Sequence, residues 1–164
     1  MSLSAIEKLR YMRNPELAEG LIKTELAKRG LTVYGARATN IQLPNYLNKD
    51  TNDYDVLAKK PKKTALEIIN KLNKEFDGEY FRLEKAKHKG TFKIKSNVTD
   101  KTVVDITQVK KFPKSKEHLG ISYRSLPSIK KTVKNVLKSG KAEFRREKDL
   151  DLLNRIELSE KQVW

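Results

Sequence analysis

Two aspartates, Asp53 and Asp55, lie one residue apart in a short run that is otherwise apolar. Because the side chains of a strand alternate between its faces, a strand over residues 53–58 directs both carboxylates to the same face. Asp105 lies within residues 103–106 (Val-Val-Asp-Ile), which also predict a strand, although aspartate is disfavoured there. Carboxylates held this close repel one another unless a cation lies between them. The pattern therefore predicts neighbouring strands whose three carboxylates hold a pair of hard divalent ions against a triphosphate.

A simpler interpretation of the aspartates stays open at this point. Asp-x-Asp is a common pattern, and Asp53 also suits the end of the polar, turn-rich segment 45–52 that precedes it. In that case Asp55 is a solvated neighbour and Asp105 is a charge at a strand edge. The combination of all three with a glycine after an upstream apolar run favours the metal-binding interpretation.

The rest of the chain shows a periodicity that alternates between helix and strand. Apolar residues recur at helical spacing after Ser4, Pro15 and Pro61, and again in two C-terminal segments. We expect helices over residues 4–13, 15–29, 36–43, 61–76, 125–138 and 141–158, and strands over 31–34, 53–58, 80–83, 91–94 and 102–109. This order predicts an α+β fold with a mixed β-sheet flanked by helices. We place the core in residues 1–110, followed over 111–164 by a basic linker and a helical C-terminal extension.

The net charge of +15 indicates a class of partner. An excess of 36 lysines and arginines over 21 acidic residues attracts phosphate polymers at long range, which predicts salt-dependent contact with nucleic acid or polyphosphate. A lysine-rich proteome or a heat-adapted host would also raise the lysine content. Without cysteine, disulfides and thiolate metal sites are excluded, and with only His88 and His118 a zinc site is not expected.

The N-terminal residues do not resemble a secretory signal, since no apolar segment follows them. No apolar stretch approaches the length needed to span a bilayer. We therefore expect a soluble, cytoplasmic protein that has no membrane partner.

Gly35 follows the first predicted strand and opens a predicted helix. A glycine there lets backbone N–H groups approach phosphate oxygens at a helix N-terminus, and Arg37 and Thr39 in the first turn add donors. Taken alone, however, Gly35 is better explained as an ordinary strand–helix turn, for which glycine is a frequent choice.

Three further groups of residues have weaker signals. The basic run over residues 110–116 suits a guide for nucleic acid and a solvated linker equally well. The charges of residues 145–148 favour an exposed helix face with i,i+4 ion pairs over phosphate contacts. Tyr123 is expected to be a core or hinge aromatic rather than a base-stacking residue.

A known superfamily shares several local features with this chain: the Gly-Ala-Arg-Ala turn at residues 35–38, Asn40, the Leu-Pro pair at 43–44 and the Asp-Tyr-Asp run at 53–55. Together they resemble the signature of the polymerase-β-like nucleotidyltransferases. The arrangement is most similar to the catalytic subunit of poxvirus-type poly(A) polymerases and related small proteins of large DNA viruses. The resemblance covers residues 31–58 and, by position, 102–107.

The resemblance implies a nucleotidyltransferase-type sheet and assigns roles to site residues. Asp53 and Asp55 become ligands of both metal ions, Asp105 becomes a ligand of the catalytic metal, and Mg²⁺ or Mn²⁺ is the expected ion. It implies nucleotide binding by Gly35, Ala36, Arg37 and Thr39. Ala36 departs from the pattern, because the family usually has Ser or Gly there and an alanine offers no hydroxyl donor to a phosphate.

The residues, the charge and the resemblance together predict a metal-dependent nucleotidyltransferase. It is expected to transfer NMP from an NTP such as ATP to a hydroxyl, in the first place a nucleic-acid 3′ end, with RNA favoured over DNA. A viral protein in its host cell is one expected setting. Two alternatives stay open: nucleotidylation of a protein or small molecule by the same site, and a catalytically inactive nucleic-acid-binding protein of the same fold.

Overall fold

The computed structural model describes residues 3–161 of the chain. Its strands form one mixed sheet of seven strands in the order β3-β4-β5-β2-β1-β7-β6. They are β1 (Thr32–Tyr34), β2 (Tyr54–Ala58), β3 (Phe81–Lys85), β4 (Thr91–Ser96), β5 (Thr102–Gln108), β6 (Ser115–His118) and β7 (Ile121–Arg124). β2 is parallel to β5 and antiparallel to β1, so the two runs that contain the aspartates are neighbours.

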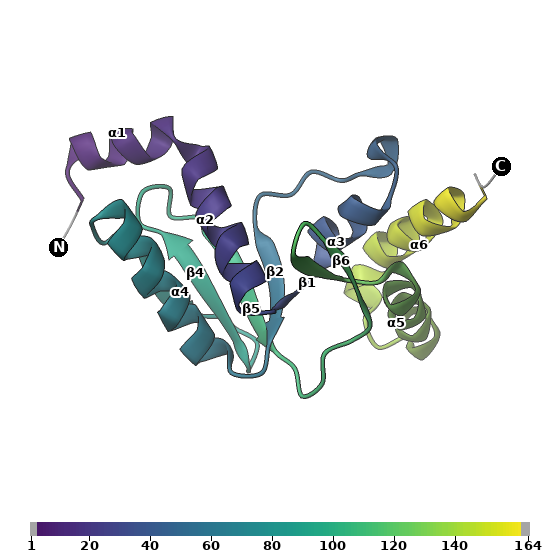
Figure 1. Cartoon of the computed structure of the whole chain (residues 1–164). Helices are drawn as coiled ribbons and strands as arrows, with labels where there is room; N and C mark the ends of the chain where they lie inside the picture. Colours follow the sequence, from purple (N-terminus) through teal and green to yellow (C-terminus); the bar gives the residue numbers. More distant parts are fainter. Residues whose placement is uncertain (1–2, 162–164) are drawn as a thin grey trace.

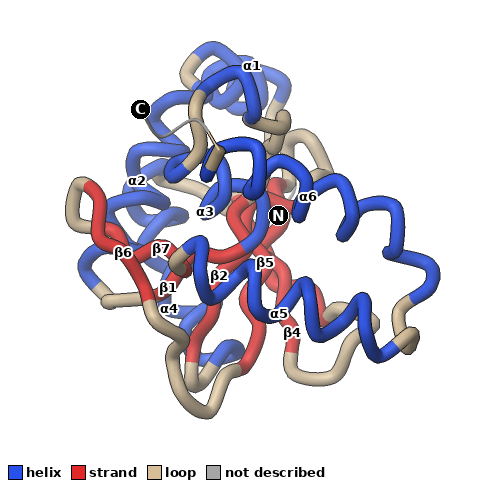
Figure 2. Tube along the Cα trace, turned by 90° about the vertical axis from the view of Figure 1, so that its right-hand side faces the viewer, coloured by secondary structure: helices blue, strands red, loops and turns tan. Residues whose placement is uncertain are grey.

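Six α-helices accompany the sheet in the described part of the chain, which confirms the predicted α+β class. They are α1 (Ala5–Arg13), α2 (Pro15–Lys28), α3 (Gly35–Gln42), α4 (Pro61–Phe76), α5 (Leu126–Ser139) and α6 (Arg146–Glu160), with single 3-10 turns at Asn45–Leu47 and Glu143–Arg145. Figures 1 and 2 show α2 and α4 on one side of the sheet and the α5–α6 pair on the other. None of the described helices combines the length and the apolarity that crossing a bilayer requires.

The core lies between the sheet and the α2–α4 layer. Alternate residues of the central strands, such as Val56 and Ile106, are fully buried on this side and pack with the apolar stripe of α4, which includes Ile68 and Leu72. Because side chains alternate along a strand, the residues between them project to the opposite side. The aspartates of β2 and β5 therefore face away from the core, toward α5 and α6.

The strands β6 and β7 were not predicted. Residues 115–118 are exposed throughout and have no apolar alternation, so they had the pattern of a linker, yet they form the edge strand of the sheet. β7 pairs in parallel with β1 and buries Ile121 and Tyr123, and this places Tyr123 in the core as expected. The sheet thus continues past residue 110, and the division into domains at that point stays a prediction.

Candidate active site

Three aspartates meet on the side of the sheet that faces α5 and α6. Asp55 and Asp105 are directly opposite each other on the parallel strands β2 and β5, and Asp53 immediately precedes β2. One carboxylate oxygen from each of the three lies within 4.8 Å of the others. The alternation of β2 places Asp53 on the same face as Asp55, with the buried Tyr54 between them on the core side. The chain therefore gathers the three carboxylates from two neighbouring strands, without any ion pair among the described residues to neutralise them.

Burial and mutual repulsion make this cluster electrostatically unfavourable by itself. The pKa of Asp55 is raised to about 7, first by burial and then by the nearby Asp53 and Asp105, against the opposing charges of Arg145 and Arg37. The pKa of Asp105 is raised too, again mainly by burial, although Lys93 opposes the shift from the neighbouring strand. One buried oxygen of Asp105 (Oδ1) has no hydrogen-bond partner among the described residues. A divalent cation would relieve the repulsion and supply the missing partner, so the residues present fit a metal ion.

Gly35 closes one side of the cluster at the start of α3. Its φ of 70° lies in the left-handed region, and a Cβ at this position would come within 2.3 Å of the Oδ2 atom of Asp55. Glycine alone both adopts a left-handed φ readily and leaves the space next to Asp55 free. α3 begins here, beside Asp55, without a side-chain N-cap. Because the first N–H groups of a helix have no intrahelical acceptor, they are available as donors for an anion.

Arg37 is directed away from this cluster. Its Nε donates to the carbonyl of Asp53 at 2.8 Å, its Nη1 donates to Glu19 at 3.3 Å, and its guanidinium lies 3.7 Å from the ring centroid of Tyr54. The Tyr54 hydroxyl also donates to Glu19. Arg37 therefore ties α3, α2 and the start of β2 together, and it holds the backbone of Asp53.

A cavity of about 460 Å³ extends from Asp55 toward α5 and α6, whereas Asp53 and Asp105 are not among its lining residues. Gly35, Asp55 and Thr39 line it at the sheet, whereas Ala36 and Arg37 are not among its lining residues. The hydroxyl of Thr39 donates to the carbonyl of Gly35 at 3.2 Å. Tyr34 also lines the cavity, and its hydroxyl is hydrogen-bonded to Thr107 on β5. The sequence-predicted nucleotide residues are therefore split between the cavity and the packing behind it.

Comparison with solved structures relates this arrangement to a known enzyme. The crystal structure of the Megavirus polyadenylate synthase superposes with a TM-score of 0.76 at 20% sequence identity, over 90% of this chain and 32% of that chain. The chain has the fold of this synthase. A second structure, JHP933 from Helicobacter pylori, matches with a TM-score of 0.45 at 17% identity over 83% of this chain and 58% of that one, too low to indicate a common fold.

The likeness to the polyadenylate synthase is structural. At 20% identity it establishes the nucleotidyltransferase fold that the short motifs predicted, and this chain spans about a third of the synthase's length. No family model matches the chain, and no curated protein matches it in sequence.

On this synthase-type fold, the far wall of the cavity contains polar residues to which the sequence analysis gave no site role. Arg124 at the end of β7 lines it and donates to Ser128 and Thr132 of α5. Arg145 and Asp149 also line it, 3.8 Å apart, and the side chain of Asp149 is buried. The expected i,i+4 ion pair on an exposed face is present, because Arg145 pairs with Asp149 and its side chain is 57% exposed, but Arg145 also borders the cavity. The Arg-x-x-x-Asp spacing, with a buried acid in an otherwise polar stretch, was the available signal.

Proposed function

We propose that this chain transfers a nucleoside monophosphate from an NTP to a hydroxyl, and that the acceptor is a nucleic-acid 3′ end. The observation that supports this most directly is the cluster of Asp53, Asp55 and Asp105, in which a buried carboxylate oxygen has no partner beside a glycine-opened helix N-terminus. Elsewhere in the described residues, no group of three or more acidic or histidine side chains converges in this way.

In this proposal Asp53, Asp55 and Asp105 would hold Mg²⁺ or Mn²⁺, with Asp53 and Asp55 as ligands of both ions and Asp105 as a ligand of the catalytic ion. Bound divalent ions would lower the pKa of that hydroxyl and neutralise the triphosphate and its leaving oxygen. The 3′ hydroxyl gives up its proton to solvent, and its oxygen forms a bond to the α-phosphorus. The bond from the α-phosphorus to the α–β bridging oxygen breaks, and pyrophosphate leaves.

The remaining side chains bind and orient the nucleotide. Because Gly35 has no side chain, the triphosphate can approach the first N–H groups of α3 next to Asp55. Arg124 and Arg145 supply positive charge on the opposite wall. The apolar residues of α5 that line the same cavity, Ile129 and Val133, exclude water from the nucleoside. Arg37 acts from behind by holding the backbone of Asp53.

The test uses each of the four labelled NTPs, with Mg²⁺ or Mn²⁺, and pools of RNA, DNA and protein as acceptors. We expect label on RNA from the wild-type chain, and a loss of roughly 10²-fold or more in Asp105→Asn, which removes a ligand charge but keeps the shape. The matched control is Asp50→Asn at an exposed position outside the site, which should transfer as the wild type does.

Other results would redirect the assignment. Label on a polypeptide instead of a nucleic acid would favour the alternative acceptor for the same site. If Asp105→Asn transferred as well as Asp50→Asn, the aspartate cluster would not be the active site. The absence of metal-dependent ATP binding in calorimetry, with RNA binding retained, would favour a silent member of the fold, as the alanine at position 36 suggests.

A further inference from the structure

Nine lysines gather where β2, β3 and β5 end. They belong to three segments, residues 59–63 after β2, 85–90 at the β3–β4 turn and 109–111 after β5, which together contain nine lysines and no acidic residue. We call these three segments the basic rim. All nine lysines are exposed, and none forms an ion pair with another described residue.

The three segments of the basic rim are adjacent in space. The N–H of Val109 donates to the carbonyl of Ala58 at 3.0 Å, and the N–H of Gln108 donates to the carbonyl of Gly90 at 2.8 Å. Figure 1 shows the lower ends of β2, β4 and β5, where these segments lie, close together. The chain therefore concentrates unpaired positive charge in one place, where like charges repel unless an anionic partner covers them.

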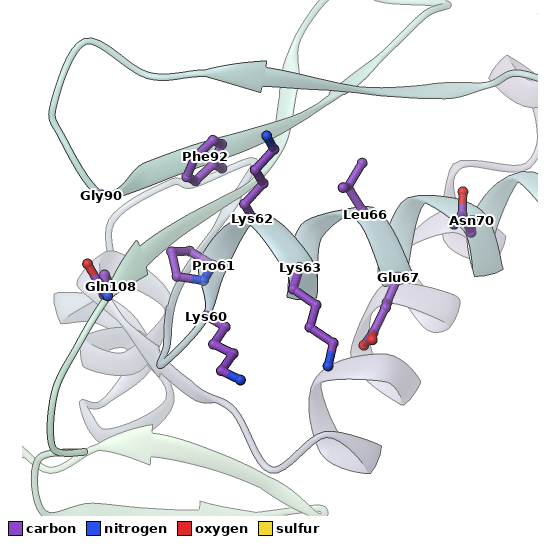
Figure 3. A pocket seen from close by; sticks show the side chains of 10 residues that line it. All are labelled: Lys60, Pro61, Lys62, Lys63, Leu66, Glu67, Asn70, Gly90, Phe92 and Gln108. Atoms are coloured by element: carbon purple, nitrogen blue, oxygen red, sulfur yellow. The ribbon is translucent and has the colours of Figure 1, made fainter.

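The basic rim borders a hollow that contains an aromatic side chain. A hollow of about 580 Å³ between α4 and the β4–β5 pair is lined by Phe92, Pro61 and Leu66 together with Lys60, Lys62 and Lys63. Its one acidic lining residue, Glu67, is paired with Arg29. Figure 3 shows the ring of Phe92 beside Lys62, with Lys60 and Lys63 extending from the start of α4. Aromatic faces next to a positively charged groove bind single-stranded nucleic acid, since every base can stack and every phosphate can pair with a lysine.

A polar path connects the rim to the aspartates. Thr91, which follows Gly90, is hydrogen-bonded to Thr107 at 3.0 Å, and Thr107 lies on the same face of β5 as Asp105. Asp105 precedes Gln108 at the rim by three residues, or roughly 10 Å of strand. Phe92 lies on the α4 side of the sheet, opposite the core residue Ile106, so a nucleic-acid strand bound there passes around the ends of β4 and β5 to reach the carboxylate cluster on the other face.

We propose that the basic rim binds the backbone of a single-stranded nucleic acid, the acceptor of the proposed transfer, with a base stacked on Phe92. This inference rests on the proposed function for the role of the strand, but its binding step is measured without catalysis. The occupant is a phosphate polymer with accessible bases, because the rim combines unpaired lysines with an apolar aromatic hollow.

The experiment measures binding of a short labelled single-stranded RNA, and of the same RNA as a duplex, without NTP or metal. The rim variant replaces Lys59, Lys60, Lys62 and Lys63 by Gln. The control replaces Lys131, Lys134, Lys138 and Lys141 by Gln, because these residues are exposed and unpaired among the described residues and lie in or next to the equally acid-free α5. Both variants remove the same net charge, so they separate the rim from the overall charge of the protein.

We expect the rim variant to bind the single strand roughly 10²- to 10³-fold more weakly at ~0.1 M salt, with a salt slope shallower by about 3. The control variant should lose less than about tenfold. Phe92→Leu, which keeps apolar packing, should weaken single-strand binding by roughly tenfold and leave duplex binding unchanged. Equal losses in the rim and control variants would overturn the proposal, and so would wild-type affinity in Phe92→Leu.

Two further measurements separate the rim from the proposed function and from another anionic partner. If the rim variant extends a long RNA with the same KM as the wild type, the rim is not the acceptor surface even though transfer is real. If RNA binds at the rim but no NTP is transferred, the rim proposal stands and the proposed function fails. Tighter binding of phosphatidylserine vesicles than of RNA through the same lysines would identify a membrane surface and overturn the assignment.

Discussion

Gly35 must lack a side chain, because Asp55 occupies the space where a Cβ would lie. Gly35→Ala combines a contact of 2.3 Å to the Asp55 carboxylate with a left-handed φ of 70°. We expect it to lower the free energy of unfolding by about 2–4 kcal/mol and to abolish transfer, because either Asp55 or the start of α3 must move. Chemical denaturation and the transfer assay measure the two effects.

Gly30→Ala provides the matched control for this prediction. Gly30 has a similar φ of 62°, but nothing lies within 4 Å of a Cβ at that position. This variant should lower the free energy of unfolding by only about 1 kcal/mol, which is the cost of the left-handed backbone conformation for alanine, and it should keep its activity. If both alanine variants behaved alike, contact with Asp55 would not be the reason for glycine at position 35.

Asp55 should make the stability of the metal-free protein depend on pH. Its pKa is raised from 3.8 to about 7 on folding, so between these values the folded state holds a proton that the unfolded state has released. The free energy of unfolding of the wild type is therefore highest, with respect to this group, at low pH, and it falls as the pH rises toward 7. In EDTA at about pH 8, we expect Asp55→Asn to be more stable than the wild type by roughly 1–3 kcal/mol.

Urea denaturation over a series of pH values measures this difference. The two proteins should converge at low pH, where Asp55 is protonated in both the folded and unfolded states. Asp50→Asn is again the control, because this aspartate is exposed and is not a member of the carboxylate cluster. A wild-type profile as flat as that of Asp55→Asn would show that neither burial nor the neighbouring carboxylates raise the pKa of Asp55 as the structure indicates.

At the scale of elements, α5 is positioned over the site by one side chain of α3. The amide of Gln42 donates to the carbonyl of Arg124 at 2.8 Å and accepts from the N–H of Leu126 at 3.1 Å, at the junction of β7 and α5. Since α5 forms one wall of the cavity, we expect Gln42→Ala to raise the KM for NTP several-fold and to cost about 1–3 kcal/mol of stability.

A second amide of the same kind gives the control for Gln42. Asn73 of α4 donates to the carbonyl of Phe81 at 3.2 Å and accepts its N–H at 2.9 Å, on the side of the sheet away from the cavity. Asn73→Ala should cost a similar amount of stability but leave the KM for NTP unchanged. An equal rise of KM in both variants would mean that general loosening, and not the placement of α5, controls nucleotide binding.

At the scale of the whole molecule, the sheet is completed only by the hairpin of β6 and β7. Without the hairpin, the three-residue β1 becomes an edge strand. The core residues against which Ile121 and Tyr123 pack are then exposed to solvent. We expect a chain ending at residue 110 to fail to unfold cooperatively, since each of these side chains contributes about 1.5–3 kcal/mol by burial. Thermal denaturation followed by circular dichroism measures this.

A chain ending at residue 125, which keeps the hairpin but lacks α5 and α6, is the comparison. It should unfold cooperatively at a lower temperature than the full chain. If the chain ending at residue 110 unfolded as cooperatively as the longer one, residues 1–110 would be an independent core, as the sequence analysis proposed.

The sequence alone determined the features that depend on local periodicity. The alternation around Asp55 and Asp105 predicted two strands with both aspartates on the polar face, and the Asp-x-Asp spacing predicted the third carboxylate beside them. Helical spacing in α2, α4 and α5 predicted those helices, because burial on one side imposes the same period on the residues. These predictions needed no knowledge of which elements touch.

Only the tertiary structure decided the features that depend on distant partners. The hairpin of β6 and β7 has no apolar alternation in its edge strand, and it exists because β1 offers a free edge for pairing. Arg37 has the pattern of a phosphate ligand, but Glu19 and Tyr54, from other elements, draw its side chain behind the site. Arg145 reaches the cavity because α6 packs against α5. The position of a residue in the helical or strand period determines the face of the element on which its side chain lies. Its contact partners depend on how the elements pack against one another.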